Sequence, residues 1–323
     1  MLHFDTPALI LAPMDGFTDA PMRALQGEIG SFSFAVSEFV RVSVDPLPAR
    51  AILRDVPELA TGSLTPTGLP VQVQILGGDP DRMALSAFNA CRAGAKAIDI
   101  NFGCPAPTVN RNDGGATLLN HPCRIRDIVA AVRAAVPREI PVSAKIRLGW
   151  DSIDAVYENS AMAAEGGASW LTIHARTRLQ GYSPPVYWKP IGVVREALGI
   201  PVVANGDIWS LDDFLRCRDQ TGCNHFMIGR GALARPSLSY EIARELGIPA
   251  REPVTDWIPL LRALLGWTER CGIRIGPKGV QRLKQWLNLA QRHGDFTGFE
   301  RVKRIDAVDD FFAALQEELA KAA

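Results

Sequence analysis

The chain has 323 residues, 47% of them hydrophobic and 22% charged, a composition typical of a globular protein with a large core. No segment approaches the roughly 18 consecutive apolar residues of a membrane span, and the N-terminus has no signal-like segment, so we expect a cytoplasmic protein without membrane contact. The formal net charge of zero argues weakly against a nucleic-acid partner, although a neutral average can conceal a local basic patch. The six cysteines form no Cys-x-x-Cys pair and no His/Cys cluster, which predicts reduced thiols and no metal site.

Short apolar segments alternate with helix-length segments along the chain. The predicted strands are 9–12, 34–37, 71–75, 97–101, 142–146, 170–173, 202–204 and 226–228. Helical segments lie between most of them, as at 81–93, 122–136, 153–165 and 211–220. Strands that are apolar on both faces and separated by helices indicate an α/β fold with a parallel sheet, and eight such units predict a closed (β/α)8 TIM barrel. A doubly wound open sheet is the alternative, but the Gly-x-Gly-x-x-Gly turn that usually follows its first strand is absent.

Polar residues and glycines follow the predicted strands at their carboxyl ends, where barrels of this class build their active sites. In chain order they are Pro13-Met14-Asp15, Glu38-Phe39, Gln74, Asn101 to Cys104, Lys145 and Arg147, His174, Asn205-Gly206-Asp207 and Gly229-Arg230-Gly231. Chance would scatter such residues over both ends of the strands. Their convergence therefore favours a functional site over a set of solvated loops.

Cys104 follows the fourth predicted strand and precedes Pro105. Pro105 biases Cys104 toward an extended backbone and Gly103 allows close approach by another group, so the thiol is expected on a stiff, exposed turn. Most free cysteines are small buried hydrophobes, and that interpretation stays open. No His lies nearby in the sequence to generate a thiolate, and an unperturbed thiol, with a pKa of about 8.5, is mostly protonated at neutral pH. A functional Cys104 is therefore interpreted as a general acid.

Glycine-containing turns follow the last two strands, at residues 205–207 and 229–231. Many barrels hold a phosphate on backbone N–H groups at this place, and Arg230 would add a charge-assisted donor. Either turn alone is equally explained as a tight entry into a helix. Together they favour a phosphate-bearing cofactor, and flavin mononucleotide (FMN) fits better than a permanently held NAD because the dinucleotide fingerprint is absent.

Lys145 and His174 end two further strands. A lysine in an otherwise apolar strand needs a partner, and beside a flavin it would stabilise the anionic reduced ring. A structural ion pair between Lys145 and either Asp99 or Asp207 is the competing interpretation. His174 is interpreted as a donor to the flavin or its phosphate, or as a satisfied structural residue.

These segments together resemble the tRNA-dihydrouridine synthases. The resemblance is carried by Ala12-Pro13-Met14, Asn101-Phe102-Gly103-Cys104-Pro105, Lys145-Ile146-Arg147, His174-Ala175-Arg176-Thr177, Asn205-Gly206-Asp207 and Gly229-Arg230-Gly231. Further segments resemble the bacterial C subfamily: Ser37-Glu38-Phe39-Val40-Arg41, Gly115-Ala116-Thr117-Leu118-Leu119, Arg147-Leu148-Gly149-Trp150-Asp151, Gln180-Gly181-Tyr182 and Arg282-Leu283-Lys284-Gln285-Trp286-Leu287. The likeness extends over nearly the whole chain, in order and at consistent spacing.

The resemblance implies a flavin-dependent oxidoreductase in which NADPH reduces FMN and the C5–C6 double bond of a tRNA uridine becomes 5,6-dihydrouridine, with Cys104 protonating C5. In the C subfamily the target is the D-loop uridine at tRNA position 16. The same matches imply cofactor contacts from Pro13, Met14, Asp15, Gln74, Lys145, His174, Asn205, Gly206, Asp207, Gly229 and Arg230. They imply uridine contacts from Asn101, Arg147 and Tyr182. Two departures, Pro107 where the family commonly has a basic residue and Asp113 where relatives tend to have a small one, bear on the RNA contacts of the loop.

The composition changes at residues 247–253, which resemble a linker. We therefore predict an FMN-binding catalytic barrel domain at residues 1–246 and a small helical tRNA-binding bundle at 247–323, with helices near 257–268, 280–291 and 308–323. Residues 262–304 contain ten Lys and Arg against three acidic residues, an excess of seven. A solvated helix face would explain this excess, and a track for RNA phosphates is the alternative, with the cations Arg41, Lys278, Arg282 and Lys284. Trp286 is expected to pack rather than stack on a base.

Three functions remain open at this stage. The first is the tRNA uridine reductase, expected as a monomer with tRNA and NADPH as partners. The second is a flavin-dependent reductase of a free pyrimidine or enone, which has no use for a basic C-terminal segment. The third is a non-catalytic RNA binder, which predicts a colourless protein that tolerates loss of the Cys104 thiol.

Overall fold

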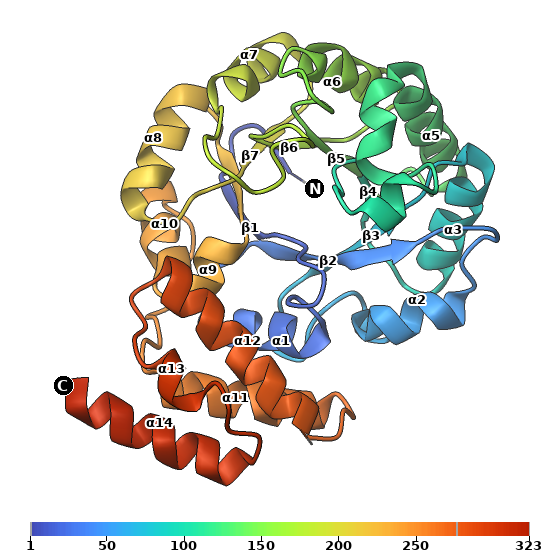
Figure 1. The fold of residues 1–323 in the computed structure, drawn as a ribbon. Helices are drawn as coiled ribbons and strands as arrows, with labels where there is room; N and C mark the ends of the chain where they lie inside the picture. Colours follow the sequence, from blue (N-terminus) through green and yellow to red (C-terminus); the bar gives the residue numbers. More distant parts are fainter. Residues whose placement is uncertain (1, 276, 323) are drawn as a thin grey trace.

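The computed structural model describes residues 2–275 and 277–322. Its centre is a closed barrel of eight parallel strands in sequence order (Figure 1). The strands are β1 (Ala8–Leu11), β2 (Phe34–Arg41), β3 (Val71–Leu76), β4 (Ile98–Asn101), β5 (Val142–Arg147), β6 (Leu171–His174), β7 (Val202–Asn205) and β8 (His225–Ile228). The barrel closes where Leu11 of β1 pairs with Ile228 of β8. The predicted TIM barrel and all eight predicted strands are confirmed.

One strand boundary was predicted wrongly. β2 continues to Arg41 instead of ending at Ser37, with a register shift between Val36 and Phe39 against β3. The pairing resumes at Phe39, which is aligned with Gln74. Such a bulge inserts extra residues into a strand and interrupts the apolar pattern, so the second half of β2 is polar enough to resemble a loop.

Helices surround the barrel, α1 to α8 between consecutive strands and α9 and α10 after the last strand (Figure 1). They are α1 (Ala20–Ile29), α2 (Ala49–Asp55), α3 (Pro80–Arg92), α4 (Pro107–Asn110), α5 (Pro122–Ala135), α6 (Ala155–Glu165), α7 (Lys189–Ala197), α8 (Leu211–Thr221), α9 (Arg230–Ala234) and α10 (Leu238–Leu246), with 3-10 turns η1 (Pro57–Thr61) and η2 (Gly115–Asn120). Several begin at a side-chain cap, since Asp19, Asp79 and Ser210 each accept a hydrogen bond from a backbone N–H in the first turn. These side-chain caps determine where the three helices begin.

The interior of the barrel is divided into an apolar and a polar half. Small and branched apolar side chains from β1, β2, β7 and β8 pack together with Trp170 on one side. On the other side β3, β4 and β5 contribute polar side chains that are at most 2% exposed, namely Gln72, Gln74, Asp99 and Ser143. Buried polar groups are costly unless they are hydrogen-bonded, so the polar half has to form an internal network.

Four C-terminal helices follow the barrel: α11 (Trp257–Arg270), α12 (Pro277–His293), α13 (Phe299–Val302) and α14 (Val308–Ala322). Figure 1 shows them beside α1 and α9. Their apolar core includes Met22 and Leu25 of α1 and Leu233 of α9. The expected packing role of Trp286 is confirmed, because its ring is 1% exposed and its Nε1 donates to the carbonyl of Leu233 at 2.8 Å. Among the described residues, no helix is both long and apolar enough to cross a membrane.

Candidate active site

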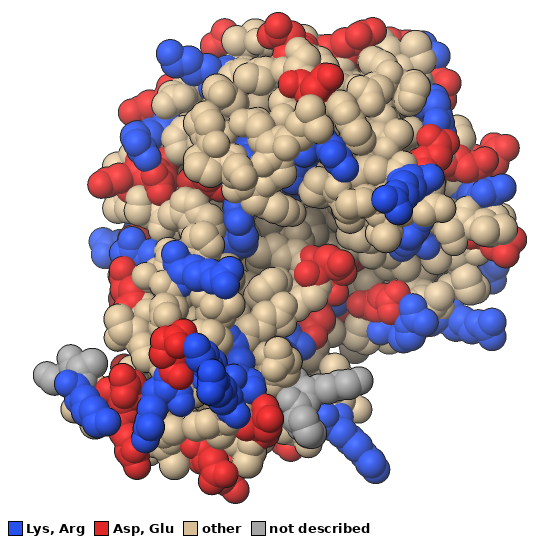
Figure 2. Space-filling model, viewed as in Figure 1, with Lys and Arg blue, Asp and Glu red and all other residues tan. Residues whose placement is uncertain are grey.

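A cavity of about 570 Å³ opens at the carboxyl end of the strands. Figure 2 shows the hollow at the centre of this face, with Lys and Arg side chains along one side and Asp and Glu side chains along another. Cys104, Asn101, Arg147 and Tyr182 line this cavity. So do all the residues predicted to bind a cofactor: Pro13, Met14, Asp15, Gln74, Lys145, His174, Asn205, Gly206, Asp207, Gly229 and Arg230.

Cys104 lies on a loop whose backbone is hydrogen-bonded on both sides. Asn101 Oδ1 accepts from the backbone N–H of Gly103 at 2.8 Å and from that of Cys104 at 3.0 Å. The carbonyl of Cys104 accepts from the N–H of Ala116 at 3.0 Å. The carbonyl of Gly103 accepts from Arg147 Nε at 2.8 Å. Because the four backbone polar groups of Gly103 and Cys104 all have partners, rotation about the Cα–Cβ bond is the main freedom left to the thiol.

The Cys104 thiol is partly buried and faces the cavity. Burial raises its pKa above that of an ordinary thiol, and the backbone N–H of Ala106 and the charge of Arg147 reduce the rise without cancelling it. A raised pKa keeps the thiol protonated at neutral pH. The alternative of a cysteine sealed in the core is therefore wrong, and the protonation state is the one that a general acid requires.

The two departures from the family pattern lie on the outer part of this loop. Pro107 begins the short helix α4, where its missing N–H is not needed. Asp113 has a φ of +55°, and its carboxylate accepts from Arg124 Nη2 at 2.7 Å. These residues shape the loop without entering the hydrogen bonds that hold Cys104.

Lys145 reaches the cavity from the end of β5. Its Nζ donates to Asn205 Oδ1 at 3.0 Å, and no carboxylate of the described residues lies within ion-pair distance of it. The proposed ion pair with Asp99 or Asp207 is therefore wrong, and Asp207 instead binds two arginines. Burial lowers the pKa of Lys145 to about 8, with a further lowering from the charge of Arg147. An ammonium group with one neutral partner is a suitable binding group for an anion.

His174 ends β6 and is 8% exposed. Its Nδ1 is buried and has no hydrogen-bond partner among the described residues. Burial and the nearby charges of Arg147 and Lys145 lower its pKa well below the usual histidine value, so the ring is neutral. A buried, unpartnered ring nitrogen at a cavity is typical of a residue that binds a ligand.

The turns after β7 and β8 form a narrow part of the cavity. A Cβ on Gly229 would stand 3.0 Å from the sulfur of Met14 and 3.2 Å from the Cβ of Ala12, so a larger residue would require these neighbours to shift. The carboxylate of Asp207 binds both Arg176 and Arg230, the latter at 3.2 Å. Asp207 therefore orients Arg230 and does not offer a free carboxylate. The resulting turn, with backbone N–H groups and one oriented guanidinium, fits a phosphate.

Arg147 and Tyr182 also line the cavity, with Tyr182 next to Arg230. Arg147 is 3% exposed, and its Nη1 donates to the carbonyls of Thr177 at 3.1 Å and Gly181 at 2.8 Å. It therefore ties the loop after β6 to the Cys104 loop, a structural role that the sequence did not indicate. Tyr182 is 57% exposed, and its ring lies 5.2 Å from the Arg147 guanidinium and 4.7 Å from that of Arg230.

Known proteins resemble this chain over most of its length. The family described as "Dihydrouridine synthase (Dus)" matches residues 10–261. The chain is 44% identical to a tRNA-dihydrouridine(16) synthase of Aquipseudomonas alcaligenes, over 88% of this chain and 90% of that protein. It is 45% identical to the protein of that name from Shewanella oneidensis and 43% identical to one from Neisseria meningitidis, which share 88% and 94% of this chain and 89% and 92% of their own.

The chain belongs to the dihydrouridine synthase family. The resemblance identified from the sequence segments is thereby confirmed. Among solved structures, an old yellow enzyme homologue from Zymomonas mobilis matches with a TM-score of 0.53 and 14% identity, over 84% of this chain and 94% of that one. This likeness supports the barrel fold.

Two of the C-terminal cations predicted to contact RNA are engaged in ion pairs within the protein. Lys284 is 6% exposed, and its Nζ donates to Asp306 at 2.8 Å. Arg282 binds Asp19 at the start of α1. The prediction of Lys284 as an RNA contact is wrong, because a buried and paired ammonium cannot reach a phosphate. Arg282 is partly buried and engaged, and the side chain of Lys278 lies outside the described residues.

Arg41 also differs from its predicted placement. It is the last residue of β2 instead of following that strand, and its Nη2 donates to the carbonyl of Thr108 at 3.3 Å. It does not line the cavity. Its positive charge offsets part of the rise that burial causes in the pKa of Cys104.

Two aromatic residues that the sequence did not single out connect the cavity to α12. Trp209 lines the cavity and stacks on His293, the last residue of α12, at a ring distance of 4.3 Å. The guanidinium of Arg230 lies 4.9 Å from the centre of the Trp209 ring. Trp209 stands two residues after Asp207, and only this proximity in sequence could have suggested it.

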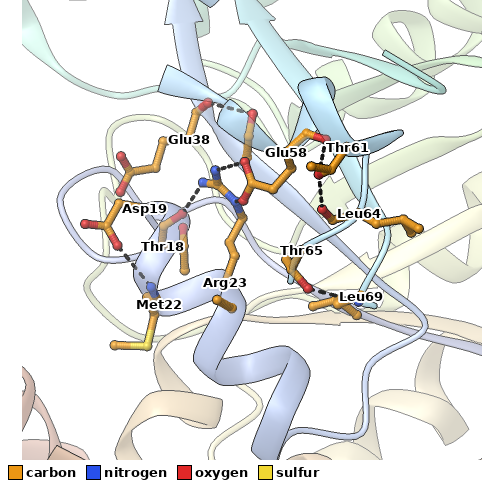
Figure 3. A network of polar contacts seen from close by, with 12 residues as sticks. Thr18, Asp19, Met22, Arg23, Glu38, Glu58, Thr61, Leu64, Thr65 and Leu69 are labelled. Carbon is orange, nitrogen blue, oxygen red and sulfur yellow. Dashed lines mark hydrogen bonds and ion pairs between the residues drawn. The ribbon is translucent and has the colours of Figure 1, made fainter. Parts of the chain in front are cut away.

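An acidic corner lies beside the cavity, where β2 meets the start of α1. Figure 3 shows the Glu38 carboxyl group directed toward Asp19, near the buried ion pair of Arg23 and Glu58. Burial and the charge of Asp19 raise the pKa of Glu38 to about 7. Glu38 Oε1 is buried without a hydrogen-bond partner among the described residues. This carboxyl group therefore titrates near neutral pH.

Proposed function

We propose that this protein reduces the D-loop uridine at position 16 of tRNA to 5,6-dihydrouridine, with FMN as its bound cofactor and NADPH as the reductant. The observation that carries the proposal is that Cys104, on a hydrogen-bonded loop, lines the same cavity as Arg230 and Lys145, whose ammonium group has only a neutral partner. The names of the relatives supply the substrate and its position.

The residues that line the cavity fit FMN. The turn of Gly229 and Arg230 offers donors to a phosphate, and Lys145 offers a positive charge to the ring. His174 Nδ1 is the buried atom without a partner that a ligand would satisfy. When bound, FMN supplies the hydride that adds to C6 of the base, drawn from NADPH.

The protein's own part of the reaction is to bind the base and to protonate it. Uracil C5 and C6 are out of reach in a stacked tRNA loop, so the base has to be unstacked, at a cost of a few kcal/mol. Tyr182, exposed at the rim, offers a ring surface for the unstacked base. Cys104 donates its proton to C5, which completes the addition of one hydride and one proton across the double bond.

We assign cofactor binding and chemistry to residues 1–246 and tRNA contact mainly to residues 247–323. Arg292, exposed on the last turn of α12, is the cation of that helix closest in sequence to His293, which packs on the cavity wall. It replaces Lys284 as our candidate for a phosphate contact.

The test is a mass-spectrometric map of dihydrouridine in tRNA from cells with and without the gene. We expect loss of the modification at position 16 alone, and its return when the purified protein is incubated with that tRNA and NADPH. An unchanged map would contradict the proposal. Efficient reduction of free uridine, with no activity on tRNA, would favour the reductase of a free pyrimidine instead.

A further inference from the structure

A buried chain of hydrogen bonds runs from Asp99 in the barrel interior to the loop of Cys104. Gln74 Nε2 donates to Asp99 Oδ2 at 2.7 Å. Asn101 Nδ2 donates to Gln74 Oε1 at 2.8 Å. Asn101 Oδ1 in turn accepts from the backbone N–H groups of Gly103 and Cys104. The three side chains are 2%, 0% and 8% exposed, so water does not compete for these bonds.

The Asp99 carboxylate determines which way each amide faces in this series of hydrogen bonds. An ionised carboxyl group accepts hydrogen bonds and donates none, so Asp99 requires the nitrogen of the Gln74 amide. The Gln74 oxygen must then face Asn101, whose nitrogen turns toward it. The Asn101 oxygen is left facing Gly103 and Cys104, as their two N–H donors require. A flipped amide at any step would place two donors or two acceptors against each other.

Asp99 is itself firmly held. Ser143 Oγ donates to Asp99 Oδ1, and Gln72 Nε2 donates to Ser143 Oγ at 2.8 Å. The strand pairing aligns Gln74 of β3 with Asp99 of β4, and Asp99 with Ser143 of β5. Burial raises the pKa of Asp99, whereas the donors Ser143 and Gln74 and the charge of Lys145 lower it. A protonated Asp99 can still accept from Gln74 while its own O–H meets Ser143, so the direction of the chain survives titration.

We propose that Asp99 is a positioning residue for proton transfer: by orienting the amides of Gln74 and Asn101, it holds the backbone of Cys104 where the thiol faces the base. The inference rests on the proposed role of Cys104 as proton donor. Asp99 does not itself reach the cavity surface, whereas Gln74, Asn101 and Cys104 all line it. The barrel thus holds the N–H groups of Gly103 and Cys104, whereas the Cys104 carbonyl is held separately by Asn110 and Ala116.

The experiment compares Asp99→Leu, which removes both acceptors of the carboxylate, with the control Gln26→Met. Gln26 is a buried amide on α1 whose side chain donates to the sulfur of Met22, outside the hydrogen bonds that link Asp99 to Cys104. In single turnovers of the pre-reduced enzyme with tRNA, Asp99→Leu is expected to slow dihydrouridine formation about tenfold. Reduction of the bound flavin by NADPH is expected to change less than about twofold, and Gln26→Met to change neither step.

A second measurement does not depend on turnover. Alkylation of Cys104 by iodoacetamide is followed by mass spectrometry of its peptide from about pH 6 to 10, with the exposed Cys123 as internal reference. In Asp99→Leu the loosened loop is expected to react severalfold faster and with an apparent pKa nearer the ordinary thiol value. Cys123 should be unaffected, and Gln26→Met should follow the wild type.

The outcomes separate the inference from the proposed function. A wild-type enzyme that makes no dihydrouridine would contradict the proposed function, and the alkylation profile would still test the support of Cys104. Unchanged uridine reduction and alkylation in Asp99→Leu would overturn the inference, as would equal slowing of both half-reactions. If Asp99→Leu does not fold, Ser143→Ala loosens the same carboxylate without changing its charge and is expected to give the same pattern at about threefold.

Discussion

The mouth of the barrel and the C-terminal helices both carry many polar side chains, but they differ in where those side chains find their partners. At the mouth, the partners come from the ends of other barrel strands, as when Lys145 of β5 donates to Asn205 of β7. On the helices, the partners come from other segments of the chain, as when Lys284 of α12 binds Asp306 in the loop between α13 and α14. The mouth therefore retains unpaired groups aimed into one cavity, whereas part of the basic excess on the helices is neutralised by ion pairs.

The largest expected effect tests the chemistry at the mouth. Cys104→Ala removes the proton donor and should lower the rate of dihydrouridine formation about 10²- to 10³-fold, the usual contribution of a general acid. FMN content should be unchanged, because the thiol is not among the groups that hold the cofactor. Loss of the flavin together with activity would instead indicate that Cys104 supports the fold of the cavity.

The second prediction uses the charge of Lys145. Its pKa of about 8 lies below the value in an unfolded chain, so the ammonium is present below about pH 8 and is lost as the pH rises through that value. Affinity for FMN should fall up to about tenfold per pH unit above this point, measured by quenching of flavin fluorescence. Lys145→Met should bind more weakly at pH 7 and show a flat profile, and Cys104→Ala should retain the wild-type profile.

The third prediction contrasts two cations of α12. Arg292→Gln should weaken tRNA binding severalfold and reduce the slope of log affinity against log salt by about 0.7 to 0.9, as expected for one lost phosphate contact. Lys284→Met should leave that slope unchanged, because Lys284 is buried against Asp306. Equal effects of the two substitutions on the slope would contradict the difference between paired and free cations.

The smallest effect is expected at the acidic corner. The pKa of Glu38 is raised to about 7, so the folded state binds its proton more tightly than the unfolded state and loses stability as the pH rises from about 4.5 to 7. Glu38→Gln should remove this loss and raise the free energy of unfolding at pH 8 by about 1 kcal/mol, with discount for partial exposure. Chemical denaturation measures the difference in the free energy of unfolding between Glu38→Gln and the wild type, which should be smaller at pH 5 than at pH 8.

Much of the fold and the cavity follows from local signals in the sequence. Eight apolar strands separated by helices require a barrel, and its topology then places residues as distant as Met14 and Arg230 at one rim. The second half of β2 escaped prediction because a bulge breaks its pattern. The hydrogen bonds of Asp99 were not predicted, because nothing next to it in the sequence shows that Gln74 and Ser143 face it inside the barrel.

The charges of the C-terminal helices were harder to predict for a different reason. The basic excess was counted over residues 262–304, and Asp306, the partner of Lys284, lies just beyond that window. Asp19, the partner of Arg282, lies near the other end of the chain. A count of nearby charges cannot include partners that only the tertiary structure brings into contact.

The shared core of α1, α9 and the C-terminal helices limits how this protein can be recombined. Met22 and Leu25 belong to the same apolar cluster as Leu283 and Trp286, so a fragment that ends at residue 246 would lose most of that cluster and expose the side chains that α1 and α9 contribute to it. A chimera meant to transfer a relative's choice of nucleotide would have to exchange α1 and α9 along with the four terminal helices. Otherwise two mismatched halves of one core would meet at the seam.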